Sequence, residues 1–101
     1  MRYTTHQYDS LIGVLGEALN QAVVGKGAER HAEPDEPFEK QVICEAGMRL
    51  GEAGPLYQAV KKIYESRRLE GEAGVKELLG AINYIAGAIV VRRQKERKLH
   101  G

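Results

Sequence analysis

The densest group of reactive side chains lies in a polar connector, residues 25–37, between two strongly helical stretches. Glycine reaches backbone angles that are closed to other residues, so Gly25 and Gly27 can turn successive N–H groups toward one point. The cations around that point are Lys26, Arg30 and His31. This combination predicts a cradle for phosphate. The same residues also fit a left-handed helix cap followed by a solvated loop.

A second set of side chains suited to phosphate-bearing ligands follows a helical spacing further along the chain. Two aromatic rings and two cations at i, i+4, i+7 and i+11 form it: Tyr57, Lys61, Tyr64 and Arg68. An aromatic ring can stack on a nucleotide base, which contributes about 1–3 kcal/mol, while a neighbouring cation meets phosphate. The alternative is that the tyrosines pack at the margin of the core and the cationic stems lie over them.

The C-terminal end of the chain is basic, although the whole chain of 101 residues carries a formal charge of only +1. Its five cations are Arg92, Arg93, Lys95, Arg97 and Lys98. With Glu96 they give this tail +4, which leaves −3 for the rest of the chain. No global field therefore drives the protein onto DNA or a membrane. The tail predicts either a contact for a nucleic acid or another phosphate-bearing partner, or a solvated helix end.

Signals for enzyme chemistry are weaker. Glu36 and Glu39 match half of the paired-carboxylate pattern by which all-α nucleotide pyrophosphohydrolases hold Mg²⁺, but no second ExxE or ExxD pair follows. Cys44 lies on an apolar stretch, as a small core residue does, and a partnership with His31 would lack a third orienting group. The three histidines are scattered, which gives no zinc spacing. We expect no catalysis, metal or cofactor, and we keep a magnesium-dependent nucleotide hydrolase as an alternative.

The apolar pattern predicts an all-α protein, because apolar residues recur at three-four spacing and no period-two alternation is long enough for a strand. A chain of 101 residues with 43% hydrophobic residues fits one domain. Pro37 and Pro55 mark helix starts. The four expected helices span residues 7–24, 37–50, 55–69 and 72–96.

The last of these helices is apolar on two sides. One seam consists of Val75, Leu78, Ile82, Ile85 and Ile89. Off this seam lie small-residue pairs seven positions apart, formed by Gly80, Ala81, Gly87 and Ala88. A helix that is apolar on two sides must be covered on two sides. We therefore expect a four-helix hairpin or bundle completed by homo-oligomerisation through this helix. The alternative is that the helix is simply central within the monomer.

The remaining sequence features concern the compartment. The single cysteine allows no intramolecular disulfide, and the N-terminal residues have no apolar signal-peptide region. The uncharged run over residues 78–91 is 14 residues long, which is short for a membrane span. We expect a cytoplasmic protein without a membrane partner.

Four runs of residues resemble small all-helical proteins of phage and prophage genomes. They are GKGAERH at 25–31, PFEKQ at 37–41, QAVKK at 58–62 and ELLGAINY at 77–84. The resemblance covers about residues 20–93 and implies a setting, the cytoplasm of an infected host, without an established activity. That setting implies nucleic-acid metabolism, or sequestration of the nucleotide signals of bacterial defences. Phage sponges of the latter kind are similar in architecture only, as small helical oligomers without catalysis.

Together these features predict a non-catalytic, oligomeric protein that binds a phosphate-bearing small molecule, foremost a nucleotide signal. The connector cations would form the site together with the second set, Tyr57, Lys61, Tyr64 and Arg68. The two sets could come from one subunit or from two. A nucleic-acid-binding accessory protein that uses the basic tail is the first alternative. A hydrolase that uses Glu36 and Glu39 is the second.

Overall fold

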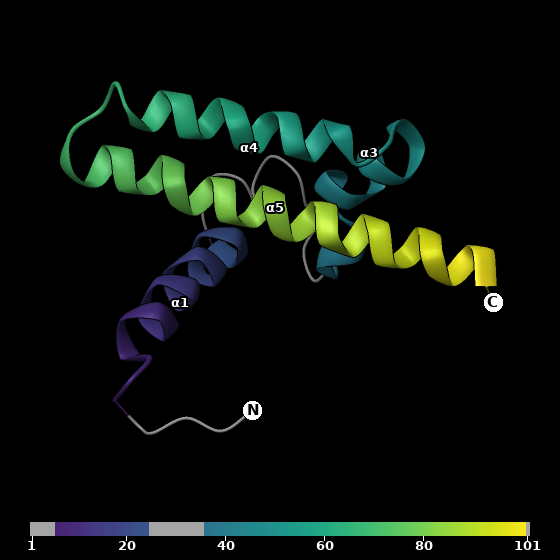
Figure 1. Ribbon diagram of the computed structural model, residues 1–101, viewed down its shortest axis with the longest axis horizontal. Helices are drawn as coiled ribbons and strands as arrows, with labels where there is room; N and C mark the ends of the chain where they lie inside the picture. The colour runs from purple at the N-terminus through teal and green to yellow at the C-terminus, as the bar shows by residue number, and fades with distance from the viewer. Residues whose placement is uncertain (1–5, 25–35, 101) are drawn as a thin grey trace.

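The computed structural model describes residues 6–24 and 36–100. It confirms the all-α prediction, because these two ranges contain four α-helices, one short 3-10 helix and no strand (Figure 1). In chain order the elements are α1 (Asp9–Val24), η1 (Phe38–Lys40), α3 (Val42–Leu50), α4 (Ala53–Ser66) and α5 (Gly71–His100).

The helix expected over residues 37–50 is interrupted at Gln41, whose backbone is extended with φ −73° and ψ 161°. The carbonyl of Gln41 accepts hydrogen bonds from the N–H groups of Cys44 and Glu45, at 3.0 and 2.9 Å. Gln41 is therefore the N-cap of α3 and separates it from η1. Pro37 is also extended, so it precedes a 3-10 turn instead of opening one continuous helix.

The hairpin of α4 and α5 is longer than expected at the end formed by the start of α4 and the last turns of α5. α4 begins at Ala53, two residues before the expected start, because proline in a first helical turn removes no needed N–H bond. α5 continues to His100. Between the two helices the chain reverses at Gly71, whose φ of 59° lies in the left-handed region that favours glycine.

α5 is the central element. Figure 1 shows α4 alongside α5 in the opposite direction, α3 beside the later part of α5, and α1 reaching α5 at an angle. Glycines permit these close approaches: a Cβ atom at Gly80 would lie 2.8 Å from Cδ of Lys62 in α4. In the same way a Cβ atom at Gly47 would lie 2.6 Å from a methyl group of Val91.

The small residues of α5 are therefore used within the chain. Gly80, Ala81, Gly87 and Ala88, which we expected to face another copy, are all buried here. A side chain at Gly87 would collide with Ile43 of α3. The alternative in which the helix is central within the monomer describes these four residues correctly. Oligomerisation itself stays a prediction.

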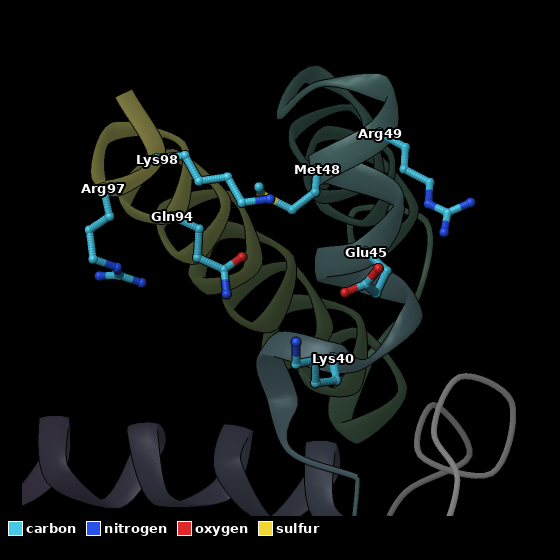
Figure 2. A pocket seen from close by; sticks show the side chains of 7 residues that line it. All are labelled: Lys40, Glu45, Met48, Arg49, Gln94, Arg97 and Lys98. Carbon is cyan, nitrogen blue, oxygen red and sulfur yellow. The ribbon is translucent and has the colours of Figure 1, made fainter. Parts of the chain in front are cut away.

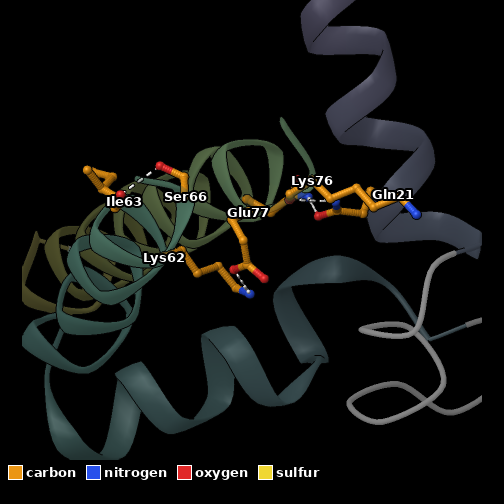
Figure 3. Close-up of polar contacts among 7 residues, drawn as sticks. Gln21, Lys62, Ile63, Ser66, Lys76 and Glu77 are labelled. Atoms are coloured by element: carbon orange, nitrogen blue, oxygen red, sulfur yellow. Dashed lines mark hydrogen bonds and ion pairs between the residues drawn. The ribbon is translucent and has the colours of Figure 1, made fainter. Parts of the chain in front are cut away.

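Two polar contacts hold the register of the hairpin. The ammonium group of Lys62 lies 3.2 Å from a carboxylate oxygen of Glu77 (Figure 3) and 5.9 Å from the ring centre of Tyr84. Near the other end, the guanidinium of Arg92 donates two hydrogen bonds to Glu52, one of them Nε to Oε2 at 3.0 Å. The pKa of Glu52 lies below its usual value, chiefly because of the hydrogen bond from Arg92.

α1 is attached through its later turns. Ala18 is buried, and its carbonyl accepts a hydrogen bond from the Asn83 amide at 3.0 Å. The Gln21 amide donates to the carbonyl of Lys76, also at 3.0 Å (Figure 3). The first turns of α1 extend away from the other helices (Figure 1).

One described helix, α5 between Gly71 and Leu99, is long and apolar enough by length and composition to cross a membrane. Of its most apolar window, 39% is buried inside this protein. Core helices of soluble proteins meet the same criterion. The expected cytoplasmic location stays a prediction.

The close approach of α3 to α5 can be tested at Gly47. Gly47→Ala places a methyl group against Val91, which is fully buried and β-branched. Such overpacking costs about 1–3 kcal/mol, whereas alanine regains up to about 1 kcal/mol of helix propensity. We expect a lower free energy of unfolding in urea denaturation followed by circular dichroism. The control is Gly54→Ala, a helical glycine with open space around it, which should not destabilise. Equal stabilities of the two variants would contradict the packing described.

Candidate functional site

The first predicted set of binding residues lies outside the described ranges. Lys26, Arg30 and His31 belong to the connector, and the proposed phosphate cradle stays a prediction. For the same reason, the structure does not place His31 relative to Cys44.

The second predicted set lies on the exposed surface of α4. Tyr57 and Tyr64 are 66% and 67% exposed, so their rings are not packed at the margin of the core. Lys61 is also exposed, and Arg68 makes only a loose ion pair with Glu65, at 3.9 Å. These side chains are available to a ligand, but they lie on an open helix surface.

A groove that the sequence analysis missed lies between α3 and the last turns of α5 (Figure 2). Its volume is about 690 Å³, and it is open to solvent. The residues that line it are Lys40, Glu45, Met48, Arg49, Gln94, Arg97 and Lys98. Four cations therefore stand against one carboxylate. They come from η1 and α3, which are neighbours in the sequence, and from the far end of α5.

The cations of the groove differ in orientation. In Figure 2, Lys98 extends from α5 toward α3, Lys40 lies at the lower end of the groove, and Arg49 and Arg97 point outward at its two margins. Cations at a helix C-terminus also stabilise the helix dipole, so Arg97 and Lys98 have a structural role without any ligand. Arg49 lies in the last turn of α3 and has the same structural role there, whereas Lys40 ends only the short helix η1.

Only part of the basic tail contributes to this groove. Arg97 and Lys98 line it, and Arg93 is exposed on the preceding turn. Lys95 is half-buried. Arg92 is occupied by its two hydrogen bonds to Glu52, which neutralise one of the five tail charges.

The carboxylates expected to hold Mg²⁺ lie at the start of the second described range. Glu39 is exposed on η1, and the carbonyl of Glu36 accepts a hydrogen bond from the Gln41 amide at 3.0 Å. Across residues 6–24 and 36–100, no group of three or more His, Cys, Asp or Glu side chains could hold a metal ion. The described residues therefore place no metal-binding cluster of three side chains at Glu36 and Glu39, and the hydrolase alternative itself stays a prediction.

Cys44 is a fully buried core residue, as predicted. Burial raises the pKa of its thiol to about 11, and the negative charges of Glu39 and Glu45 add to this effect. Because a thiolate is the nucleophilic form, a thiol that stays protonated at neutral pH is unsuited to covalent catalysis.

Comparison with known proteins adds no identification, since no family model, curated protein or solved structure matches this chain. The fold and the candidate site define a small all-α protein with a basic, solvent-open groove on its central helix. The resemblance to phage proteins stays a prediction.

The raised pKa of Cys44 predicts slow alkylation of the folded protein. At pH 8 a thiol with a pKa of about 11 holds roughly 100-fold less thiolate than one at its usual 9.0. Burial slows the reaction further. We expect mass spectrometry to show at least this difference between iodoacetamide labelling of native protein and of protein in denaturant. Equal labelling rates would show that Cys44 is not buried and that the pKa of its thiol is not raised.

Proposed function

We propose that the protein binds a phosphate-bearing small molecule, foremost a nucleotide, in the groove between α3 and α5, and leaves it chemically unchanged. The observation that supports this function is that four cations from three separate elements line one groove of about 690 Å³, two of them at its margins. Small-molecule sites commonly have volumes of about 300–1,000 Å³.

The groove offers distinct chemistry for each part of a nucleotide. The ammonium groups of Lys40 and Lys98 act as compact charges for phosphate, and Arg49 or Arg97 can add a bidentate hydrogen-bonding fork. The lining also includes Met48, whose thioether is a polarizable surface on which a base can lie. Gln94 and Glu45 provide amide and carboxylate groups for the hydrogen bonds of a base or sugar.

Two features of the described part of the chain favour binding without turnover. The carboxylates there form no cluster for a metal ion, and the thiol of Cys44 is buried and protonated. A phage protein with these properties would act in the host cytoplasm by sequestering a nucleotide signal of an anti-phage defence.

The test is calorimetric titration with a panel of linear and cyclic nucleotides. Arg97→Gln and Lys40→Gln should each weaken binding about 10-fold or more, because hydrogen bonds to charged groups contribute about 1.5–3 kcal/mol. The matched control is Arg93→Gln, which removes the same charge from α5 one turn earlier, outside the groove. It should bind as the wild type does.

Three results would overturn this proposal. The first is that no nucleotide binds. The second is that Arg93→Gln lowers the nucleotide affinity as much as the groove variants do. The third is that only Lys61→Gln and Arg68→Gln lower the affinity, which would place the site on α4. The bound ligand, released by heating after incubation with Mg²⁺, should be chromatographically intact. Conversion that disappears in Glu39→Gln would favour the hydrolase instead.

Binding of single-stranded nucleic acid is the second candidate function. It is favoured by the open form of the groove and by the exposed Arg93, which extends the positive charge along α5. Polymer binding releases counterions, so log K falls with log salt by about 0.7 for each phosphate neutralised. A small ligand responds less steeply to salt.

We therefore expect nucleotide affinity to change little between 50 and 200 mM salt, values chosen to span the range in which polymer binding is lost. Fluorescence anisotropy with a labelled oligonucleotide provides the comparison. If the oligonucleotide binds more tightly than any nucleotide and Arg93→Gln lowers its salt slope by about 0.7, the protein is a nucleic-acid-binding protein.

A further inference from the structure

One side of the α4–α5 hairpin has a continuous apolar surface, which we call the hairpin strip. Its side chains are Leu56, Val60 and Ile63 of α4 and Leu78, Ile85 and Ile89 of α5. Each set repeats at three-four or seven-residue spacing, so it lies along one side of its helix. All six side chains are exposed to a considerable degree, between 39% and 48%.

The register of the hairpin brings the two sets together. The contact Lys62–Glu77 pairs late α4 with early α5, and the contact Arg92–Glu52 pairs the start of α4 with late α5. In this register Ile63 lies at the level of Leu78, and Leu56 lies at the level of Ile85. α3 meets α5 at Gly87 and Val91, which are on the other side of the helix from Ile85 and Ile89. The hairpin strip therefore lies opposite α3 and the basic groove.

α1 presents a second apolar surface, which we call the α1 face. It consists of Leu11, Ile12, Leu15 and Leu19, which are between 48% and 64% exposed. These residues follow helical spacing along α1, whose first turns extend away from the other helices (Figure 1). The only charged side chains of α1 are Asp9 and Glu17.

The described helices leave more large apolar side chains exposed than they bury. Only seven hydrophobic residues of the described ranges are buried, and the largest fully buried side chains are Val91 and Cys44. Every side chain of the hairpin strip and of the α1 face, in contrast, is at least 39% exposed. Contiguous apolar surface of this kind marks a site of association with a partner.

We infer that a second copy of this chain covers both surfaces, with α1 of each copy lying on the hairpin strip of the other. Because one chain carries both surfaces, a two-fold axis satisfies the two contacts at once and closes the assembly. The charges are compatible: α1 brings only carboxylates, and Arg67 follows the end of the strip one turn after Ile63. The basic groove stays accessible, since it lies on the opposite side of α5.

The exchange is tested with a single charge placed on each surface. Wild-type protein should have twice the monomer mass in sedimentation velocity. Leu19→Lys and Ile85→Glu should each have the monomer mass with unchanged helical circular dichroism, because both side chains are exposed within one chain. The matched control is Leu50→Glu, at a position of α3 that is 83% exposed and outside both surfaces. It should remain dimeric.

Mixing the two monomeric variants distinguishes exchange from other interfaces. A mixed dimer has one intact contact between α1 and the hairpin strip and one contact that pairs the new lysine with the new glutamate. The equimolar mixture should therefore regain the dimer mass. Pairing of α1 with α1 predicts no recovery. A monomeric wild type, a dimeric Leu19→Lys variant, disruption by Leu50→Glu or an unrecovered mixture would each overturn the inference.

Discussion

The close approach of the helices to α5, at positions without bulky side chains, is the constraint on which the rest of the structure depends. Gly80 makes room for Lys62, Gly87 for Ile43, and Gly47 of α3 for Val91. Small residues bury little apolar area, and hydrophobic stabilisation is about 25 cal/mol for each Å² removed from water. The largest fully buried side chains are accordingly only Val91 and Cys44. Most large apolar side chains of the described helices remain at the surface, where they are available to a partner.

The same packing gives α5 two different sides. Where α3 ends, the last turns of α5 continue beyond it and place Arg97 and Lys98 along the basic groove that Lys40 and Arg49 also line. On the opposite side, α5 and α4 leave the hairpin strip exposed. Ligand binding and self-association are therefore proposed for separate surfaces. Because the two surfaces lie on opposite sides of α5, we expect a substitution on one surface to leave the function of the other unchanged.

The sequence predicts the features that depend on local pattern. Three-four spacing identifies the helices, and the apolar neighbourhood of Cys44 identifies a core residue. Features that depend on tertiary packing could not be predicted. Small residues such as Gly80 and Gly87 look the same in a sequence whether they pack against another copy of the chain or against α3 and α4 of the same chain. The groove was missed because its cations lie in three segments with no common period, and the extended backbone of Gln41 separates Lys40 from Arg49. The connector cations lie outside the described residues.

The central claim is that α5 is packed within each chain, whereas α1 is completed by a second copy. Hydrogen exchange measured by mass spectrometry at two protein concentrations, on either side of the dimer dissociation constant, tests both halves of this claim. The account predicts that amides of α5 between Leu79 and Val91 are equally protected at both concentrations. Amides of α1 between Leu11 and Leu19 should gain protection only at the higher one. If α5 stays protected but the protection of α1 is the same at both concentrations, the claim that a second copy covers α1 is contradicted.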